Sequence, residues 1–252
     1  MGDVRLRGAI FDVDGVLVDS PHERAWRESL DALMQGEWAD IAPQTRWQPG
    51  GLTSALYAEH VAGKPREDGA RAALEALGIP DGDRVQRYSE AKQALVAKLI
   101  EQDQFRPFDD GVGLLLRLKD AGLRVAAASS SRNAPALLAR VPVAEVCRRR
   151  GESYPFVGAG TSLADLLDAD LSGRHFEHGK PDPAIFLAAA EALGVDPSAA
   201  LVIEDAPSGV EAARRGGMRS VGVNRADDAD DLRDHGATWV VDSLDDVPEL
   251  PV

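Results

Sequence analysis

The alternation of apolar and polar positions along the chain predicts an α/β core. Short runs of apolar, β-favouring residues predict buried strands at 9–11, 123–128, 200–203, 220–223 and 238–241. Apolar residues at helical spacing lie between these runs, at 110–119, 183–193 and 209–215. Strands that alternate with helices form a parallel sheet covered on both faces, so we predict a Rossmann-like, doubly wound parallel sheet.

Residues 21–104 carry a different pattern, with helical periodicity and no strand candidate. The helical segments lie at 22–34, 52–61, 66–77 and 84–101. Because this block falls between the first and second predicted strands, we interpret it as an insertion. We therefore predict an α/β core of residues 1–20 and 105–252 and an inserted all-helical domain of residues 21–104.

Capping residues mark two of the helices in the core. Asp109 or Asp110 can cap the helix that precedes the second strand. Asp182 is the predicted N-cap of the helix over 183–193, which has Pro183 at its first position.

Two stretches have no clear period, residues 35–51 and 141–179. We interpret the first as an irregular connection. In the second, residues 161–167 predict a helix, and Leu171 is the candidate start or end of a strand.

The acidic composition narrows the possible partners. A formal net charge of −14 argues against nucleic acid, because nucleic-acid phosphates bind to a basic surface. This charge also repels a phosphate ester unless a metal ion or local cations intervene. No apolar run is long enough to cross a membrane, so we expect no membrane partner. The run Arg148-Arg149-Arg150 is interpreted as a solvated face without a function.

The start of the sequence and its cysteine content indicate the cytoplasm. Charged residues and then a strand open the sequence, in place of the apolar segment of a signal peptide. Cys147 is the single cysteine, which excludes an internal disulfide, and we interpret it as a packed or incidental thiol. We expect a monomer or a weak homodimer.

The segment Ile10-Phe11-Asp12-Val13-Asp14-Gly15 carries the first candidate chemistry. It places two carboxylates, two residues apart, at the end of a buried strand, and Gly15 lets the backbone turn sharply behind them. Such a pair can share a divalent cation and leave one carboxylate free for nucleophilic or acid chemistry. The alternative is an ordinary strand that ends in an Asp-Gly turn.

Two further strand ends and one helix start carry reactive groups. Ser129 follows the second strand, and Glu204 with Asp205 ends the third. Lys180 lies just before the helix over 183–193. Each alone has a plain structural interpretation as a turn or surface residue. Because ligands of open α/β sheets bind at the carboxyl ends of the strands, together they predict a phosphoryl-transfer site.

These four motifs resemble those of the haloacid dehalogenase superfamily and span essentially the whole chain. The resemblance implies that Asp12 is the nucleophile, which forms an aspartyl phosphate, and that Asp14 is the general acid and base. It implies that Ser129 and Lys180 hold the phosphoryl oxygens. It also implies a Mg²⁺ site, with Asp12, Asp14, Glu204 and Asp205 as candidate ligands. An acid at Asp14 argues against the dehalogenases themselves, which have no leaving alcohol to protonate.

The helical insertion resembles the small helical cap of the β-phosphoglucomutase-like subgroup of that superfamily. His22-Glu23-Arg24-Ala25-Trp26 is similar to the subgroup's His-x-Arg-Ala-Trp segment, and residues 61–68 to its substrate loop. Lys92 matches a lysine of the cap, and 129–133 resembles a phosphate loop. The implied substrate-binding residues are His22, Arg66, Lys92, Ser130, Arg132 and Asn133. The alternatives are a helix-terminal residue for His22 and solvated helix faces for Arg66 and Lys92.

The sequence departs from this subgroup in places. The segment between Asp19 and His22 is shorter than in the mutases, 35–60 and 141–179 are longer than in small mutases, and Arg132 stands where lysine is usual. Arginine replaces a point charge by a planar fork. These changes leave the core motifs intact and affect the choice of substrate.

The resulting expectation is a Mg²⁺-dependent phosphatase that acts on small sugar phosphates through an aspartyl phosphate. The first alternative is a β-phosphoglucomutase that interconverts β-glucose 1-phosphate and glucose 6-phosphate. The second is a non-catalytic module that binds a phosphorylated metabolite, although such a module would usually have lost one of Asp12, Asp14, Lys180 or Asp205. A dinucleotide-dependent dehydrogenase lacks support, because Gly158-Ala159-Gly160 is not followed by the third glycine of that fingerprint.

Overall fold

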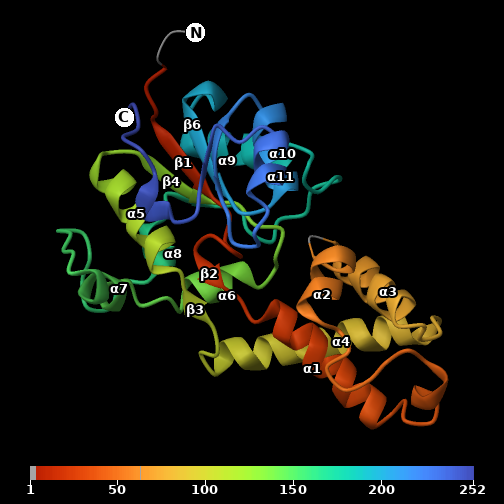
Figure 1. Cartoon of the computed structure of the whole chain (residues 1–252). Coiled ribbons are helices and arrows are strands. Elements are labelled where there is room, and N and C mark those ends of the chain that lie inside the picture. The colour runs from red at the N-terminus through yellow and green to blue at the C-terminus, as the bar shows by residue number, and fades with distance from the viewer. Residues whose placement is uncertain (1–3, 63) are drawn as a thin grey trace. The chain divides into compact units, whose positions relative to one another are not determined.

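The computed structural model describes residues 4–62 and 64–252, and the chain divides into two compact units (Figure 1). The core unit contains the chain up to Asp19 and Arg106–Val252. The helical unit is Ser20–Phe105. Within the described part of the chain, no helix is both long and apolar enough to cross a membrane.

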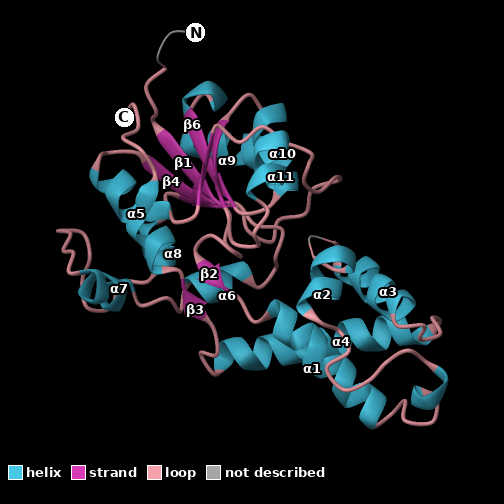
Figure 2. Cartoon of the chain, viewed as in Figure 1, coloured by secondary structure: helices cyan, strands magenta, loops and turns pink. Residues whose placement is uncertain are grey.

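A parallel sheet forms the centre of the core unit (Figure 2). Among the described residues its strand order is β5-β4-β1-β6-β7-β8. These strands are β1 (Gly8–Phe11), β4 (Arg124–Ala127), β5 (Ala169–Asp170), β6 (Ala200–Glu204), β7 (Arg219–Val223) and β8 (Trp239–Val241). All neighbours in this order pair in parallel, which confirms the predicted doubly wound core. The central strand β1 aligns Phe11 with Ala127 of β4 and Ile203 of β6.

Helices lie between the strands of the core unit along the chain. They are α5 (Asp109–Asp120), α6 (Ala134–Leu138), α7 (Val143–Arg150), α8 (Leu163–Leu166), α9 (Ala184–Leu193), α10 (Pro207–Arg215) and α11 (Ala229–Asp234). Buried residues of α9 and α10, among them Phe186 and Ala212, form one cluster with Ile10 and Val202 of the sheet. Short 3₁₀ turns lie at Pro197–Ala199 and Leu244–Asp246.

Two short strands lie where the chain leaves the core unit and returns to it. Strand β2 (Val18–Asp19) pairs antiparallel with β3 (Arg106–Pro107). Arg106 also donates a hydrogen bond to the Asp19 carboxylate at 3.2 Å. The β2–β3 pair thus joins the two segments at which the chain leaves the core unit and returns to it.

The helical unit has its own apolar core. Its helices are α1 (His22–Gln35), α2 (Ser54–His60), α3 (Arg66–Ala76) and α4 (Asp83–Glu101), with a 3₁₀ turn at Ala42–Gln44. Trp26 of α1 meets Tyr88 of α4 edge to face, with ring centres 5.0 Å apart. The Tyr88 hydroxyl donates to the Trp26 carbonyl at 2.8 Å, which satisfies a fully buried polar group. The described residues of this unit contain no strand, as the periodicity predicts.

Two helix starts differ from the predictions. The N-cap of α5 is Phe108, with no side-chain cap, so the expected cap by Asp109 or Asp110 was wrong. These carboxylates instead bind arginines: Arg149 donates to Asp109, and Arg225 donates to Asp110. Helix α9 begins at Ala184, after Pro183 as N-cap, although the Asp182 carboxylate still accepts from the Ala184 N–H at 2.9 Å.

One residue of the run Arg148-Arg149-Arg150 departs from the predicted solvated face, whereas the side chains of Arg148 and Arg149 are 74% and 44% exposed. The Arg150 side chain is only 13% exposed and forms ion pairs with Glu152 and Asp245. Helix α7 turns this residue toward the 3₁₀ turn near the end of the chain, a partner too distant in sequence for charge patterning to reveal. Cys147 is buried on the same helix, in agreement with a packed thiol.

Candidate active site

The candidate residues of the core unit gather at the carboxyl edge of the sheet. Asp12 follows β1, Ser129 lies just beyond β4, and Glu204 is the last residue of β6. Because β4, β1 and β6 are adjacent parallel strands, their carboxyl ends meet at one edge. The strand order therefore brings together three segments that are far apart in the sequence.

Lys180 lies at the centre of this group. Its Nζ donates to Asp12 Oδ1 at 2.5 Å and to Glu204 Oε1, and it lies 3.5 Å from the Ala128 carbonyl oxygen. The ammonium also stands over the ring of Phe186, 4.8 Å from its centre. Two carboxylates and an aromatic face offset the free-energy cost of burying this charge. These contacts hold the lysine in one place.

The Glu204 carboxylate is held from two sides. Its Oε2 accepts from the backbone N–H groups of Asp205 and Ala206, both at 3.0 Å, while Oε1 accepts from Lys180. A side chain at Gly209 would place its Cβ only 1.9 Å from Oε1, so this carboxylate packs directly on the first turn of α10. Glu204 therefore orients Lys180 and the following turn.

Asp14 lies in a tight turn that begins the segment after β1. Gly15 adopts φ +79°, a conformation that favours glycine, and its N–H donates to the Val18 carbonyl at 3.0 Å. A Cβ on Gly15 would lie 1.8 Å from Asp205 Oδ2. The Asp205 carboxylate thus occupies the space beside the backbone of this turn.

Burial and neighbouring charges shift the titration of the site. Burial raises the pKa of Asp12 to about 7, with Glu204 and Asp14 contributing in the same direction and Lys180 opposing them. Burial and the charges of Glu204 and Asp12 raise the pKa of Asp205 well above its ordinary value. For Lys180, burial alone would lower the pKa, but Asp12 and Glu204 outweigh it and raise the pKa. The site thus contains more negative charge than Lys180 can balance.

This donor set fits a Mg²⁺ ion. Carboxylate oxygens are ligands that Mg²⁺ prefers, and the raised pKa values of Asp12 and Asp205 indicate a place where a cation would relieve repulsion. Among the described residues, no group of three or more His, Cys, Asp or Glu side chains forms a ready-made metal site. A carboxylate pair is consistent with Mg²⁺, which keeps several waters and binds substrate phosphates.

The segment after β4 forms a compact loop around Ser129. The Ser129 side chain is 3% exposed, and its Oγ accepts from the Ser131 N–H at 3.2 Å. Asn133, the N-cap of α6, donates its N–H to Ser131 Oγ at 3.2 Å. Ser130 and Arg132 of the same loop are exposed. Ser129 is thus the loop residue placed at the buried end of the sheet.

In the helical unit, His22 and Lys92 lie together. Lys92 Nζ is 3.2 Å from His22 Nδ1 and 5.0 Å from the centre of the Trp26 ring. Lys92 is only 6% exposed, so its interpretation as part of a solvated helix face was wrong. The stripe of apolar residues on α4 and the aromatic ring of α1 bury its stem. Arg66 is exposed and begins α3, and Gly63 of the predicted substrate loop lies outside the described residues.

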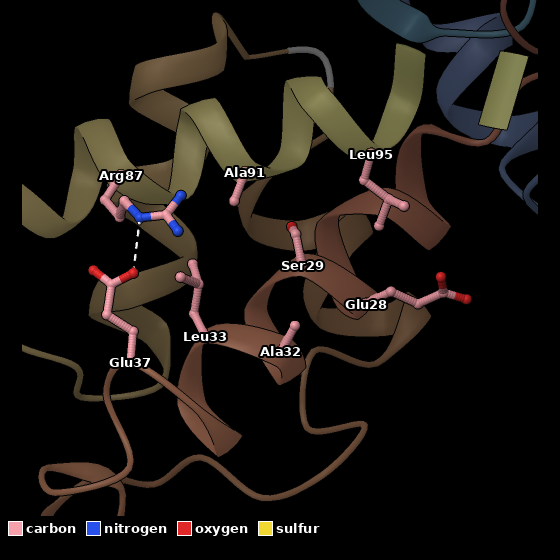
Figure 3. A pocket seen from close by; sticks show the side chains of 8 residues that line it. All are labelled: Glu28, Ser29, Ala32, Leu33, Glu37, Arg87, Ala91 and Leu95. Atoms are coloured by element: carbon pink, nitrogen blue, oxygen red, sulfur yellow. Dashed lines mark hydrogen bonds and ion pairs between the residues drawn. The ribbon is translucent and has the colours of Figure 1, made fainter. Parts of the chain in front are cut away.

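A separate hollow of about 360 Å³ lies between α1 and α4 (Figure 3). Ala91 and Leu95 of α4 face Ser29 and Leu33 of α1 across it, and Arg87 donates to Glu37 at 2.9 Å. Its lining is Glu28, Ser29, Ala32, Leu33, Glu37, Arg87, Ala91 and Leu95. None of these residues was predicted to bind substrate, and small apolar side chains with one exposed ion pair indicate no defined ligand.

Two further residues, neither of which was predicted from the sequence pattern, contact the candidate active site at the carboxyl edge of the sheet. Phe186 lies against Lys180 from α9, and its position among apolar helix residues predicts only a core role. Arg225 donates to the Gly15 carbonyl at 3.0 Å. It follows the end of β7 by two residues, so the same strand-end rule that identified Ser129 could have found it.

Comparison with known proteins identifies the family. A sequence profile described as haloacid dehalogenase-like hydrolase matches residues 6–217. The chain belongs to the haloacid dehalogenase-like hydrolase family. Its place in this family makes it an enzyme, a phosphatase or phosphomutase, which confirms the family and reaction class expected from the four motifs.

The relatives of this chain include proteins named as phosphomutases and proteins named as phosphatases. The β-phosphoglucomutase of Mycobacterium tuberculosis is 37% identical over 260 residues, which cover 95% of this chain and 90% of that protein. The fructose-1-phosphate phosphatase YqaB of Escherichia coli is 30% identical over 221 residues, which cover 87% of this chain and 97% of that one. The solved structure of an archaeal β-phosphoglucomutase from Pyrococcus has a TM-score of 0.68 and 25% identity, with 96% of this chain and 95% of that one covered.

Proposed function

We propose that this enzyme is a phosphomutase of β-phosphoglucomutase type, acting on a small sugar phosphate through a phosphorylated Asp12. The observation that carries the proposal is the contact of Lys180 with both Asp12 and Glu204 at the carboxyl edge of the sheet. This arrangement holds the proposed nucleophile and a cation side by side, so a phosphoryl group bound to Asp12 would lie next to the ammonium.

The first half-reaction transfers a phosphoryl group to Asp12. A carboxylate oxygen of Asp12 forms a bond to phosphorus while the bond from phosphorus to the leaving oxygen breaks. Asp14 donates a proton to that oxygen, which departs as a hydroxyl group. Lys180 and the Ser129 loop stabilise the negative charge on the phosphoryl oxygens during the transfer.

The second half-reaction returns the phosphoryl group to an acceptor. Asp14 takes the proton of the attacking hydroxyl, the new bond to phosphorus forms, and the bond to Asp12 breaks. Water as acceptor makes the enzyme a phosphatase, and a sugar phosphate makes it a mutase. A mutase also needs a cationic group for the second phosphate, and we propose Arg66 and Lys92, with His22 beside Lys92, for this role.

Mg²⁺ is the proposed cofactor, and Asp12, Asp14 and Asp205 are the residues that would hold it. When bound, it would neutralise charge on the transferring phosphoryl group. Glu204 was also predicted as a ligand, but its oxygens accept from Lys180 and two backbone N–H groups, so we propose that it orients the site.

Two observations favour the mutase over the phosphatase that the sequence alone favours. The greater similarity is to a protein named β-phosphoglucomutase, over nearly the whole of both chains. The helical unit also holds a buried lysine against a histidine, a suitable site for a second phosphate. The phosphatase remains the second candidate, because a named sugar phosphate phosphatase is 30% identical.

The deciding experiment incubates the enzyme with β-glucose 1-phosphate, Mg²⁺ and a trace of the 1,6-bisphosphate. We expect glucose 6-phosphate to accumulate much faster than free phosphate, and both reactions to stop in a chelator and resume with added Mg²⁺. Free phosphate as the main product would favour the phosphatase. No product from any sugar phosphate in a panel, with Mg²⁺ present, would contradict the proposed substrate class.

A further inference from the structure

Arg225 lies at the same edge of the sheet as the proposed catalytic residues. It follows β7, the strand next to β6. Its side chain is one-fifth exposed, so most of the guanidinium is withdrawn from solvent. Neither of the two half-reactions proposed above uses it.

The guanidinium of Arg225 donates hydrogen bonds through two of its nitrogens, and one of its faces contacts an aromatic ring. Its Nε donates to the Gly15 carbonyl at 3.0 Å, and its Nη2 donates to both carboxylate oxygens of Asp110, at 2.8 and 3.0 Å. The ring of Phe108 stacks against it, with its centre 4.2 Å from the guanidinium carbon. These contacts fix the plane and direction of the fork.

Asp110 in turn is fixed by the backbone around it. Its oxygens accept from the N–H groups of Gly111 and Leu244, both at 2.9 Å, and from the Ser243 hydroxyl at 3.3 Å. The carboxylate therefore joins the start of α5 to the 3₁₀ turn near the end of the chain. Arg225 binds both this carboxylate and the Gly15 carbonyl, so it connects the fixed carboxylate to the turn that contains Asp14.

The Asp14–Gly15 turn is thus held at three points. The Gly15 N–H binds the Val18 carbonyl, its carbonyl binds Arg225, and the Asp205 carboxylate fills the space where a side chain would be. The direction of the Asp14 side chain depends on the backbone of this turn. Loss of one of the three constraints would let the turn move.

We propose that Arg225 is a positioning residue, which holds the Asp14–Gly15 turn so that Asp14 is aligned for proton transfer. This inference rests on the proposed function, in which Asp14 is the acid and base. Arg225 acts through the Gly15 carbonyl and not on the substrate, because its fork is used by Gly15 and Asp110.

The role can be separated from simple structural support by the choice of leaving group. A sugar alkoxide needs a proton as it departs, whereas 2,4-dinitrophenolate departs as a stable anion. A misaligned acid should slow transfer from the sugar 1,6-bisphosphate and spare transfer from 2,4-dinitrophenyl phosphate. General damage to the fold would slow both.

The experiment measures the single-turnover rate of phosphoryl transfer to the enzyme, by rapid quench, for both phosphoryl donors in wild type, Arg225→Lys, Asp110→Asn and Asp14→Asn. Lysine keeps the charge but cannot bind Gly15 and Asp110 as a fork. We expect Arg225→Lys to slow the sugar reaction by about tenfold or more and the dinitrophenyl reaction by less than about twofold. Asp110→Asn should follow the same pattern more weakly, and Asp14→Asn more strongly. Arg233→Gln, which breaks an exposed ion pair with Asp230, is the control and should change neither rate.

The outcomes distinguish this inference from the proposed function. The positioning role is overturned if Asp14→Asn discriminates between the donors but Arg225→Lys and Asp110→Asn do not. In that case these two variants would slow the reactions of both donors equally, or would slow neither. If Asp14→Asn slows both donors equally, the proposed acid is wrong and the inference fails with it. Thermal melts show which variants fold. If Arg225→Lys does not fold, Asp110→Asn tests the network in its place.

Discussion

In the described part of the chain, each unit holds one largely buried lysine, and the two lysines are held differently. Lys180 in the core unit donates to two carboxylates and lies over an aromatic ring. Lys92 in the helical unit contacts a histidine nitrogen and the face of an indole. Lys180 is thus held by ion pairs, whereas the contacts of Lys92 with the imidazole and the indole orient its ammonium.

This contrast indicates that the two units have different roles, phosphoryl transfer in the core unit and substrate recognition in the helical unit. The core unit places Lys180 among buried carboxylates, so removal of one partner leaves another buried charge without its ion pair. The helical unit orients the ammonium of Lys92 against an imidazole and an indole. We therefore expect changes in the core unit to abolish phosphoryl transfer to any acceptor, and changes in the helical unit to affect only substrates that carry a second phosphate.

The largest effect should come from Asp12→Asn in the core unit. The amide cannot attack phosphorus, so we expect turnover to fall by about a thousandfold or more with every donor. Rapid-quench measurements should detect no phosphorylated enzyme, while circular dichroism should remain that of the wild type. If one-tenth of the wild-type rate persisted, covalent transfer to Asp12 would have to be abandoned.

A smaller, substrate-dependent effect should follow from changes in the helical unit. Arg66→Ala and Lys92→Met should each reduce mutase turnover by about tenfold or more, because an ion pair with a phosphate is lost. Hydrolysis of a small aryl phosphate should change by less than about twofold. Steady-state kinetics with the two substrates measures the ratio.

The matched control for Lys92 is Lys98→Met on the same helix, at an exposed position. It should leave both rates unchanged. Equal losses for the sugar phosphate and the aryl phosphate in Lys92→Met would show that this lysine supports the fold of the unit and would remove the contrast between the two lysines.

The smallest effect concerns stability in the core unit. Burial would raise the pKa of Asp110, but hydrogen bonds from Arg225 and the Leu244 N–H outweigh it and hold the pKa below its ordinary value. A lowered pKa in the folded state gives stability that is present above the pKa of the unfolded state, about 3.9. This stability is lost as the pH falls through the folded-state pKa.

We expect Asp110→Asn to lower the free energy of unfolding by about 1–3 kcal/mol at pH 7. The difference from wild type should be constant between about pH 7 and pH 5 and should shrink below about pH 4. Urea unfolding at several pH values measures it, with the exposed Asp230→Asn as control. A difference that did not depend on pH would contradict the ion pair as its source.

The strands and their chemistry could be predicted from the sequence because both are local signals. The run before Asp12 and the run before Glu204 are apolar over several residues, and the reactive groups follow directly. Parallel pairing then places these ends together without further information. For the edge strand β5, two half-buried residues long, the sequence indicates only a strand boundary at Leu171, next to its last residue.

Contacts between distant segments could not be predicted in this way. Asp110 has the sequence signature of an N-cap, and only the folded chain shows that its carboxylate binds Arg225 and Leu244. Lys92 has polar neighbours typical of an exposed helix face, and its burial depends on Trp26 from another helix. Short helices such as α6 and α11 are too brief for a periodic signal.

The central position of β1 also determines the order in which the molecule can be assembled. The helical unit is one continuous segment, so its contacts are available as soon as residue 105 has been synthesised. Strand β1 is made before it but must wait for β4 on one side and for β6 on the other. Until β6 emerges, one edge of β1 has no partner, and an open apolar strand edge favours aggregation. The strand that leads to the proposed nucleophile is therefore made before the helical unit, and it is enclosed only after residue 204 has been synthesised.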